Sequence, residues 1–326
     1  MESLPSASLP HAMRGKFMNS NDFACTLCPI ECHADRSKTC GACGVGGFDA
    51  QELCGANPNE TARVARAARH YFEEPSISGK NGSGAIFFSG CNLRCVFCQN
   101  MDISSRQKGR LADSASLAEM MLRLEQLGSH NINLVTPSVH IELLKKAIPL
   151  ARRQGLSIPI VYNTNAYEKA ETLRSIEGLV DIYLPDLKYV SGEAAKKYSG
   201  RADYFKFASD SVLEMQRQCG VLTVDENGIA KKGVLVRHLV LPGSVDEARG
   251  VLDFIHDNMP IETHISIMSQ YTPMFELPAP LNRRVQKREY KRAVEYAIAL
   301  GFQNLWIQEL SSAESTFTPE FNDFFE

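Results

Sequence analysis

From residue 85 onward, short apolar runs alternate with longer amphipathic stretches. The apolar runs, which we expect to form strands, are 85–90, 131–136, 159–163, 179–184, 233–240 and 263–268. The amphipathic stretches, which we expect to form helices, are 115–128, 140–154, 167–176, 192–199, 203–219, 245–258 and 286–300. This alternation is typical of βα units around a parallel sheet. The pattern therefore predicts an α/β fold, with an added edge strand at Leu305-Trp306-Ile307.

The same pattern divides the chain into five parts. We expect a disordered leader (1–21), a cysteine-rich metal-binding module (22–56), a helical linker and loop (57–84), the βα body (85–308) and a C-terminal tail (309–326). The linker is expected to be helical because the segment from Asn59 to Phe72 has high helix propensity. Within the body, Asp225-Glu226-Asn227-Gly228 is a hairpin turn signal and predicts a peripheral insertion.

Charge and hydropathy exclude several classes of partner. The chain has 35 basic and 38 acidic side chains and no block of like charge, so neither nucleic acid nor an anionic membrane is the expected partner. No apolar run approaches the roughly 20 residues of a membrane-spanning helix. The first twenty residues lack the apolar core of a secretory signal. We expect a cytoplasmic protein, although a weak organellar leader stays possible.

Nine of the ten cysteines precede residue 100, and three of them follow the first expected strand as Cys91, Cys95 and Cys98. Thiolates are soft ligands that select zinc or iron–sulfur clusters. An all-cysteine cubane normally takes four thiolates, so three leave one iron open to a substrate or cofactor. Buried free thiols, or a zinc site that borrows a histidine, are the alternatives. Three cysteines within eight positions, among polar neighbours, favour the metal site.

The C-x3-C-x2-C spacing, with aromatic Phe97 before the last cysteine, resembles the signature of the radical S-adenosylmethionine (SAM) superfamily. The resemblance implies a [4Fe–4S] cluster on Cys91, Cys95 and Cys98 whose open iron is chelated by SAM. It also implies a partial (β/α)6 barrel, which agrees with the six expected strands. Phe97 is then expected near the adenine of SAM.

In parallel barrels, working residues lie at the carboxyl ends of strands. Those positions hold Asn163-Thr164, Asp186-Leu187-Lys188 and Arg237. They narrow the resemblance to the activating enzymes of glycyl radical enzymes, typified by the pyruvate formate-lyase activating enzyme. The resemblance implies that Asn163, Thr164, Asp186 and Arg237 surround SAM and a monovalent cation, and that Lys188 faces the substrate as a catalytic residue. Asn163 stands where that family has an acid, which removes one charge from the cation site. The alternative for Asp186 and Lys188 is a surface ion pair.

Two further positions carry weaker signals. Thr136-Pro137 replaces the Gly-Gly-Glu element that meets the SAM amino group in many superfamily members. Thr136 is either a cofactor contact, through its carbonyl and hydroxyl, or part of a simple turn. His238 alternates to the opposite face of its strand from Arg237, so we expect a structural role for it.

The first cysteine block reads Cys25-x2-Cys28-x3-Cys32, followed by Cys40-x2-Cys43. The spacing indicates a metal site but suits structural zinc and a second iron–sulfur cluster equally. The chain is most similar to an uncharacterised subgroup of radical SAM proteins that resemble the pyruvate formate-lyase activating enzyme. That resemblance implies the ligand set Cys25, Cys28, Cys32 and Cys43, with Cys40 and Cys54 as extras. A structural metal would fold a module that has little core of its own.

The resemblance also implies a reaction. SAM is cleaved reductively to methionine and a 5′-deoxyadenosyl radical, which removes hydrogen from a substrate; in activating enzymes that substrate is a glycine of a partner glycyl radical enzyme. Flavodoxin or ferredoxin is the expected electron donor. Radical modification of a small molecule or peptide is the first alternative. A catalytically inactive zinc-binding scaffold is the second.

Overall fold

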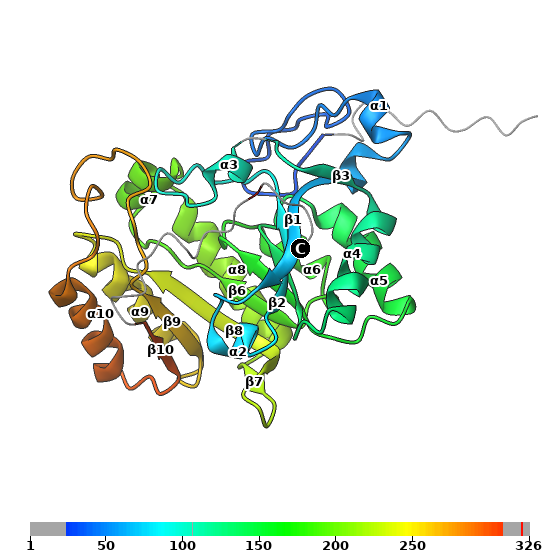
Figure 1. The fold of residues 1–326 in the computed structure, drawn as a ribbon. Helices are drawn as coiled ribbons and strands as arrows, with labels where there is room; N and C mark the ends of the chain where they lie inside the picture. The colour runs from blue at the N-terminus through cyan, green and yellow to red at the C-terminus, as the bar shows by residue number, and fades with distance from the viewer. Residues whose placement is uncertain (1–23, 106, 309–320, 322–326) are drawn as a thin grey trace, which may run out of the picture.

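The computed structural model describes residues 24–105, 107–308 and 321. The expected leader and nearly all of the expected tail lie outside these residues. In the described part, ten strands form one sheet in the order β10-β9-β8-β6-β5-β4-β2-β1-β3, with β7 paired to β8 (Figure 1). The strands are β1 Ala62–His70, β2 Ser83–Phe88, β3 Arg110–Ala112, β4 Ile132–Val135, β5 Ile160–Thr164, β6 Ile182–Pro185, β7 Thr223–Val224, β8 Ala230–Leu239, β9 His264–Met268 and β10 Leu305–Ile307.

The six expected body strands are confirmed as β2, β4, β5, β6, β8 and β9, which pair in parallel in this order. The expected edge strand is β10, parallel to β9. These strands are almost wholly buried because helices cover the outer face of the sheet. The result is the predicted α/β fold, a partial barrel whose sheet stays open between β10 and the β1–β3 edge.

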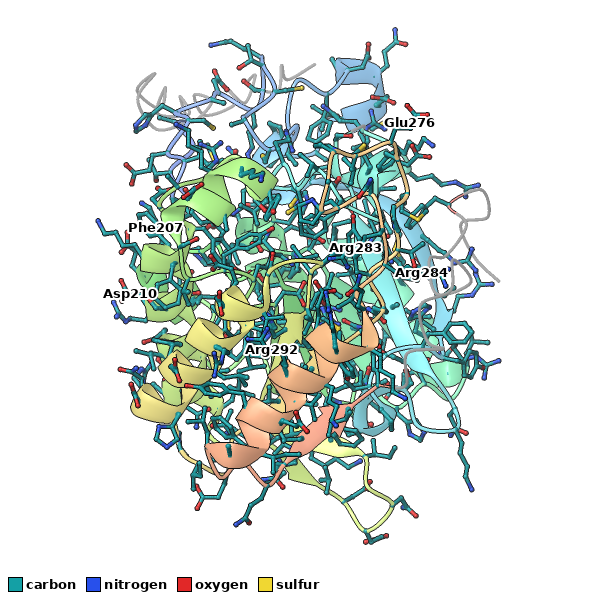
Figure 2. All side chains as sticks on the ribbon, turned by 90° about the vertical axis from the view of Figure 1, so that its left-hand side faces the viewer. Phe207, Asp210, Glu276, Arg283, Arg284 and Arg292 are labelled. Atoms are coloured by element: carbon teal, nitrogen blue, oxygen red, sulfur yellow. The ribbon has the colours of Figure 1, made fainter. Side chains whose placement is uncertain are left out.

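The helices that pack outside the sheet follow the expected stretches closely. In Figure 2, Arg292 marks α10 and Phe207 marks α8 on the outer surface. Leu117, Leu124, Val212 and Leu252 are among the side chains that these helices bury against the sheet. The longer helices are α4 Ser114–Gln126, α5 Ile141–Arg153, α7 Gly192–Ser199, α8 Tyr204–Cys219, α9 Val245–Asn258 and α10 Lys287–Ala299; the shorter ones are α1 Ala50–Leu53, η1 Pro58–Glu60, α2 Pro75–Ser78, α3 Met101–Ser104 and α6 Ala170–Arg174. Among the described residues, no helix is long and apolar enough to cross a membrane.

One prediction is wrong. The linker segment expected to be helical is strand β1, which pairs with β2 on one side and β3 on the other. Its alanines have high helix propensity, but propensity is a weak preference that strand pairing and burial override. Ala62, Ala67 and Ala68 are at most 2% exposed. Arg66, on the same strand, is also buried.

The predicted hairpin insertion is confirmed. Strand β7 pairs with the start of β8, and Gly228 in the turn has a φ of +77°. Gly233, with φ +125°, lets β8 pass close to the returning chain, because a β-carbon there would lie 2.3 Å from the Cα of Leu222.

Strand β1 determines how the chain enters the barrel. It runs antiparallel to β2, so that His70 at its end pairs with Ser83 at the start of β2. The chain therefore leaves β1 at the amino ends of the parallel strands. The next residues, Phe72 to Glu74, lead into α2, and they bring two acidic side chains to the inside of the sheet.

Candidate active site

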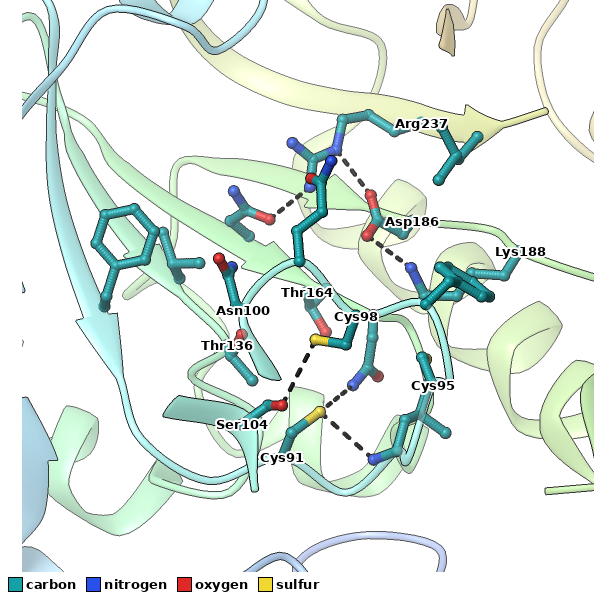
Figure 3. A pocket seen from close by; sticks show the side chains of 18 of the residues that line it. Cys91, Cys95, Cys98, Asn100, Ser104, Thr136, Thr164, Asp186, Lys188 and Arg237 are labelled. Atoms are coloured by element: carbon teal, nitrogen blue, oxygen red, sulfur yellow. Dashed lines mark hydrogen bonds and ion pairs between the residues drawn. The ribbon is translucent and has the colours of Figure 1, made fainter. Parts of the chain in front are cut away.

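A cavity of about 240 Å³ lies at the carboxyl ends of the parallel strands (Figure 3). The tertiary structure brings to its wall ten of the residues that the sequence singled out. They are Cys91, Cys95, Phe97, Cys98, Thr136, Asn163, Thr164, Asp186, Lys188 and Arg237. Because these residues come from five strands and the loops that follow them, only the curvature of the sheet makes them neighbours.

The loop that carries the three cysteines begins at Gly90, whose φ is +94°. A β-carbon at Gly90 would lie 2.5 Å from the Val45 side chain, so only glycine lets the loop pack on the amino-terminal module. The amide of Cys91 donates a hydrogen bond to the carbonyl of Cys43 at 3.0 Å. The two cysteine-rich segments are therefore in direct contact.

Polar groups surround the three thiols. The Asn165 amide donates to Cys91 Sγ at 3.3 Å, Ser199 Oγ lies 3.0 Å from Cys95 Sγ, and Ser104 Oγ lies 3.5 Å from Cys98 Sγ. Burial raises the pKa of Cys91 to about 12, and it also raises the pKa of Cys95. Soft sulfur donors at one end of a cavity, with polar groups in contact with the sulfurs, suit an iron–sulfur cluster, whose potential such contacts tune.

Arg237 joins the strands on the far wall of the cavity. Its Nε donates to Asp186 Oδ1 at 2.8 Å, its Nη1 to Glu73 Oε2 at 2.9 Å, and its Nη2 to Asn163 Oδ1 at 2.7 Å. Burial alone would raise the pKa of Asp186, but Arg237 and Lys188 outweigh it and hold that pKa below its usual value. Asp186 is therefore ionised at neutral pH.

Lys188 lies on the same wall, with its Nζ 2.8 Å from Asp186 Oδ2 (Figure 3). The side chains of Lys188 and Asp186 are only 15% and 23% exposed, so the pair is enclosed in the cavity and the surface ion pair considered from the sequence is excluded. Burial lowers the pKa of Lys188, but the neighbouring Asp186 and Cys95 together outweigh burial, so the pKa lies above its usual value. Lys188 stays cationic.

Sequence reasoning missed Glu73. Its Oε1 accepts hydrogen bonds from the side-chain amides of Asn133 at 3.0 Å and Asn163 at 3.2 Å, while its Oε2 accepts from Arg237. The acid that the activating-enzyme pattern places at position 163 is thus replaced by a carboxylate from a distant segment. The paired acids before Pro75 were the available signal, but nothing local indicates that they point into the barrel.

The two threonines occupy different environments. Thr136 has a φ of +62°, which is rare for a β-branched residue, and its amide donates to the carbonyl of Asn163 at 2.9 Å. Strain of this kind gathers at functional sites. The Thr164 hydroxyl instead bonds to Glu168, a buried acid that also accepts from Tyr162 Oη at 2.7 Å. Burial raises the pKa of Glu168.

His238 has the structural role expected of it. Its side chain is buried, and its Nδ1 is 2.8 Å from the carbonyl of Leu187, next to Lys188. The contact ties β8 to the loop after β6. Burial lowers the pKa of His238, so it remains neutral.

In the amino-terminal module, the structure separates the cysteines into two groups. A β-carbon at Gly41 would lie 3.2 Å from Cys32 Sγ and 3.5 Å from Cys43 Sγ, so both sulfurs approach the same point. Burial raises the pKa of Cys28 to about 11, and Cys43, Cys25 and Cys32 raise it further as electrostatic neighbours. Those four are the set implied by the resemblance.

Cys40 and Cys54 are exposed and point elsewhere. Cys40 Sγ contacts the carbonyl of Gly46, and Cys54 Sγ contacts the carbonyl of Gln51. In the described part of the chain, no three Cys, His, Asp or Glu side chains converge as tightly as ligands around a bound ion. The case for a metal in either cysteine set therefore rests on donor chemistry and on placement in the fold.

Comparison with known proteins assigns the chain to a family. The family model described as "Radical SAM superfamily" matches residues 85–255, more than half of the chain. The chain belongs to the radical SAM superfamily. This family implies a [4Fe–4S] cluster and SAM as cofactors.

Two curated proteins are similar to this chain in sequence. The chain is 30% identical over 227 residues to an uncharacterised protein of Methanocaldococcus jannaschii, covering 66% of this chain and 62% of that one. It is 24% identical over 180 residues to the pyruvate formate-lyase-activating enzyme of Clostridium pasteurianum, covering 54% and 68%. The chain thus spans less than two thirds of the length of the first relative.

Solved structures with related folds are more distant. Streptococcus suis SuiB bound to S-adenosylmethionine aligns at a TM-score of 0.44 and 15% identity, over 67% of this chain and 47% of that one. A domain of the pyruvate-formate lyase-activating enzyme from Bacteroides vulgatus aligns at 0.40 and 11% identity, over 56% and 100%.

Proposed function

We propose that this chain is a radical SAM enzyme that cleaves SAM reductively and removes a hydrogen atom from a substrate. One observation carries the proposal: three thiols at C-x3-C-x2-C spacing and the enclosed triad Asp186, Lys188 and Arg237 line the same cavity. When bound, a [4Fe–4S] cluster on Cys91, Cys95 and Cys98 supplies the electron and the open iron that this chemistry requires.

The chain's own residues bind and orient. Lys188 and Arg237 are cations at the strand ends, where they suit the carboxylate of an amino acid such as the methionine part of SAM. Asp186 and Glu73 hold these cations in place and supply negative charge for the ammonium and sulfonium groups. Phe97, which meets the ring of Tyr271 edge to face at 6.1 Å, provides an apolar wall for a base.

We infer that the substrate belongs to one of two classes. Similarity to an activating enzyme supports a glycine of a partner glycyl radical enzyme, with flavodoxin or ferredoxin as electron donor. The absence of a Gly-Gly-Glu element at Thr136, and the cysteine-rich module, favour modification of a small molecule or peptide instead. A partner protein mixed with the reduced enzyme and SAM must acquire a persistent glycyl radical signal in electron paramagnetic resonance if the first is right.

We also infer a second metal on Cys25, Cys28, Cys32 and Cys43, zinc or iron–sulfur. The approach of Cys32 and Cys43 to one point supports it. The hydrogen bond between Cys43 and Cys91 supports a position for this metal next to the loop of Cys91, where it would stiffen the loop and the module together.

The test of the radical reaction starts from anaerobic protein. Iron and sulfide are measured, SAM and dithionite are added, and 5′-deoxyadenosine is quantified. The unaltered chain should release it, while Cys91→Ser, Cys95→Ser and Cys98→Ser should lose the iron of this cluster and should release no 5′-deoxyadenosine. Cys219→Ser is the matched control, because Cys219 is buried outside both cysteine sets. Two results would contradict the proposal. One is release of 5′-deoxyadenosine that survives all three serine substitutions, and the other is no release from the unaltered chain, as an inactive zinc-binding scaffold would give.

A further inference from the structure

A second cavity, of about 170 Å³, adjoins the first through the open side of the barrel. One wall is the segment from Phe72 to Pro75, and the other is formed by the ends of β9 and β10. The two cavities share five lining residues: Phe72, Glu73, Arg237, Met268 and Gln270. A molecule held in the second cavity would therefore reach the wall of the first.

Two buried polar groups on this second cavity, Glu74 Oε2 and Ser266 Oγ, form no hydrogen bond of normal length with the described residues. The Ser266 side chain still interacts with Glu74 and lowers the pKa of that carboxyl, so the two groups face each other. Glu74 is 8% exposed and Ser266 is 1% exposed. The nearest cation to Glu74 is Arg237 Nη1 at 3.9 Å, and that nitrogen already donates to Glu73. A buried acceptor without a donor is costly, so such groups usually mark a ligand or an ordered water.

The local charges leave none over for Glu74. Glu73 and Asp186 already balance Arg237 and Lys188, so an ionised Glu74 would be a third carboxylate without a cation of its own. Burial raises the pKa of Glu74, with Glu73 adding to the shift and Arg237 opposing it. A bound cation would compensate that charge and lower the pKa of Glu74.

The remaining walls are apolar. Pro75, Met268, Trp306 and Ile307 line the cavity, together with the amide side chain of Gln308. An inorganic ion needs oxygen ligands on most sides, whereas these walls suit methylene groups. The chain after the cavity offers no cation of its own, since residues 309–326 contain no Lys, Arg or His.

We propose that the second cavity binds a primary ammonium group on an aliphatic stem, with the ammonium on Glu74 and Ser266 and the stem against Met268 and Trp306. The inference rests on the proposed radical function and names its substrate class: an alkyl amine, such as a basic side chain or a free amine. The shared wall would let the carbon chain of that amine extend towards the cofactor cavity, where a hydrogen atom is removed.

The test uses Trp306, which is the single tryptophan of the chain. Its emission is followed in the anaerobic holoenzyme during titration with n-butylammonium chloride, and separately with 1-butanol and with potassium chloride at equal ionic strength. We expect a saturable change with the amine, and at least tenfold weaker responses with the alcohol and the salt. Equal responses to amine and alcohol, a response to potassium alone, or none to the amine would overturn the inference.

Substitutions test whether the change in emission arises from amine bound at Glu74 and Ser266. Glu74→Gln keeps the shape and removes the charge, and it should weaken amine binding at least tenfold; Glu226→Gln, in the exposed hairpin turn, should not change it. Should Glu74→Gln lower the unfolding midpoint, Ser266→Ala gives an independent measure and should weaken binding severalfold. Amine binding that is unchanged in both variants contradicts the inference.

The emission measurement needs no radical chemistry, so the two proposals fail separately. Release of 5′-deoxyadenosine without a specific amine response overturns only the substrate class. A specific amine response in protein that never cleaves SAM overturns the proposed function and leaves the amine site.

Discussion

Arg237 Nη1 lies 2.9 Å from Glu73 Oε2, across 164 positions of sequence. Glu73 enters the barrel from the amino ends of the strands and Arg237 lies on β8, so this contact fastens the strand-to-helix turn before α2 to the wall of the cofactor cavity. Both side chains are nearly enclosed, at 12% and 10% exposure. Removing either partner of such an enclosed ion pair leaves the other charge buried without compensation, which lowers the stability of the fold.

Glu73→Gln should therefore destabilise the protein. The amide cannot accept from two asparagines and an arginine as a carboxylate does, and the loss should be roughly 1.5–3 kcal/mol, as for a hydrogen bond to a charged group. Urea unfolding followed by circular dichroism checks this, with Glu226→Gln as the control. Identical midpoints for the two variants would show that the contact between Glu73 and Arg237 contributes nothing.

Lys188→Gln should weaken SAM binding about tenfold, which corresponds to about 1.4 kcal/mol. The substitution removes a cation from the cavity wall but touches no cysteine ligand, so iron content should stay unchanged. Lys231→Gln is the matched control, because Lys231 also pairs with an aspartate, Asp225 at 3.0 Å, but in the hairpin. Equilibrium dialysis with SAM gives the affinities. Equal affinities in both variants would remove Lys188 from the binding site.

The amino-terminal cysteines should behave as two groups. Cys43→Ser should lose the second metal and lower the unfolding midpoint, because Cys43 is buried beside Cys32. Cys54→Ser, at an exposed position, should keep full metal content. Elemental analysis of iron and zinc per chain separates the outcomes and identifies the metal. Loss of metal from the Cys54 variant, or none from the Cys43 variant, would refute the ligand set.

Buried histidines should make the protein less stable as the pH falls. Burial lowers the pKa of His140 to about 3, whereas an unfolded histidine titrates near 6.5. Between these two pKa values, the unfolded state binds a proton at His140 that the folded state does not bind. Stability is complete above pH 6.5 and falls below it, by about 2 kcal/mol for this group at pH 5.

His140→Gln should flatten this dependence, since glutamine does not titrate. His256→Gln is the control for the substitution itself, because His256 is 41% exposed. Thermal midpoints between pH 7.5 and 5 measure both. A slope that stays the same in the His140 variant would mean that His140 has the same pKa in the folded and unfolded protein, which contradicts the prediction.

Local sequence was enough for the body of the fold. The alternation of apolar and amphipathic runs marks all six parallel strands to within a few residues, because a buried parallel strand and its covering helix have different periods. The cysteine spacing and the polar residues after each strand indicate the cavity in the same way. Each signal is contained in about ten consecutive positions.

The helix expected between Asn59 and Phe72 shows the limit of such signals. Its alanines favour a helix in isolation, and only the edges of β2 and β3 on either side make a strand more stable. Neither edge is visible in the segment itself.

Glu73 and Glu74 show the same limit at the site. Sequence alone determined the class of chemistry, through three cysteines and the residues that end each strand. Only the tertiary structure decided that β1 runs antiparallel, and that its exit brings two carboxylates beneath Arg237. Long-range pairing is set by which surfaces can be buried together, and that information is spread over the whole chain rather than held in any short segment.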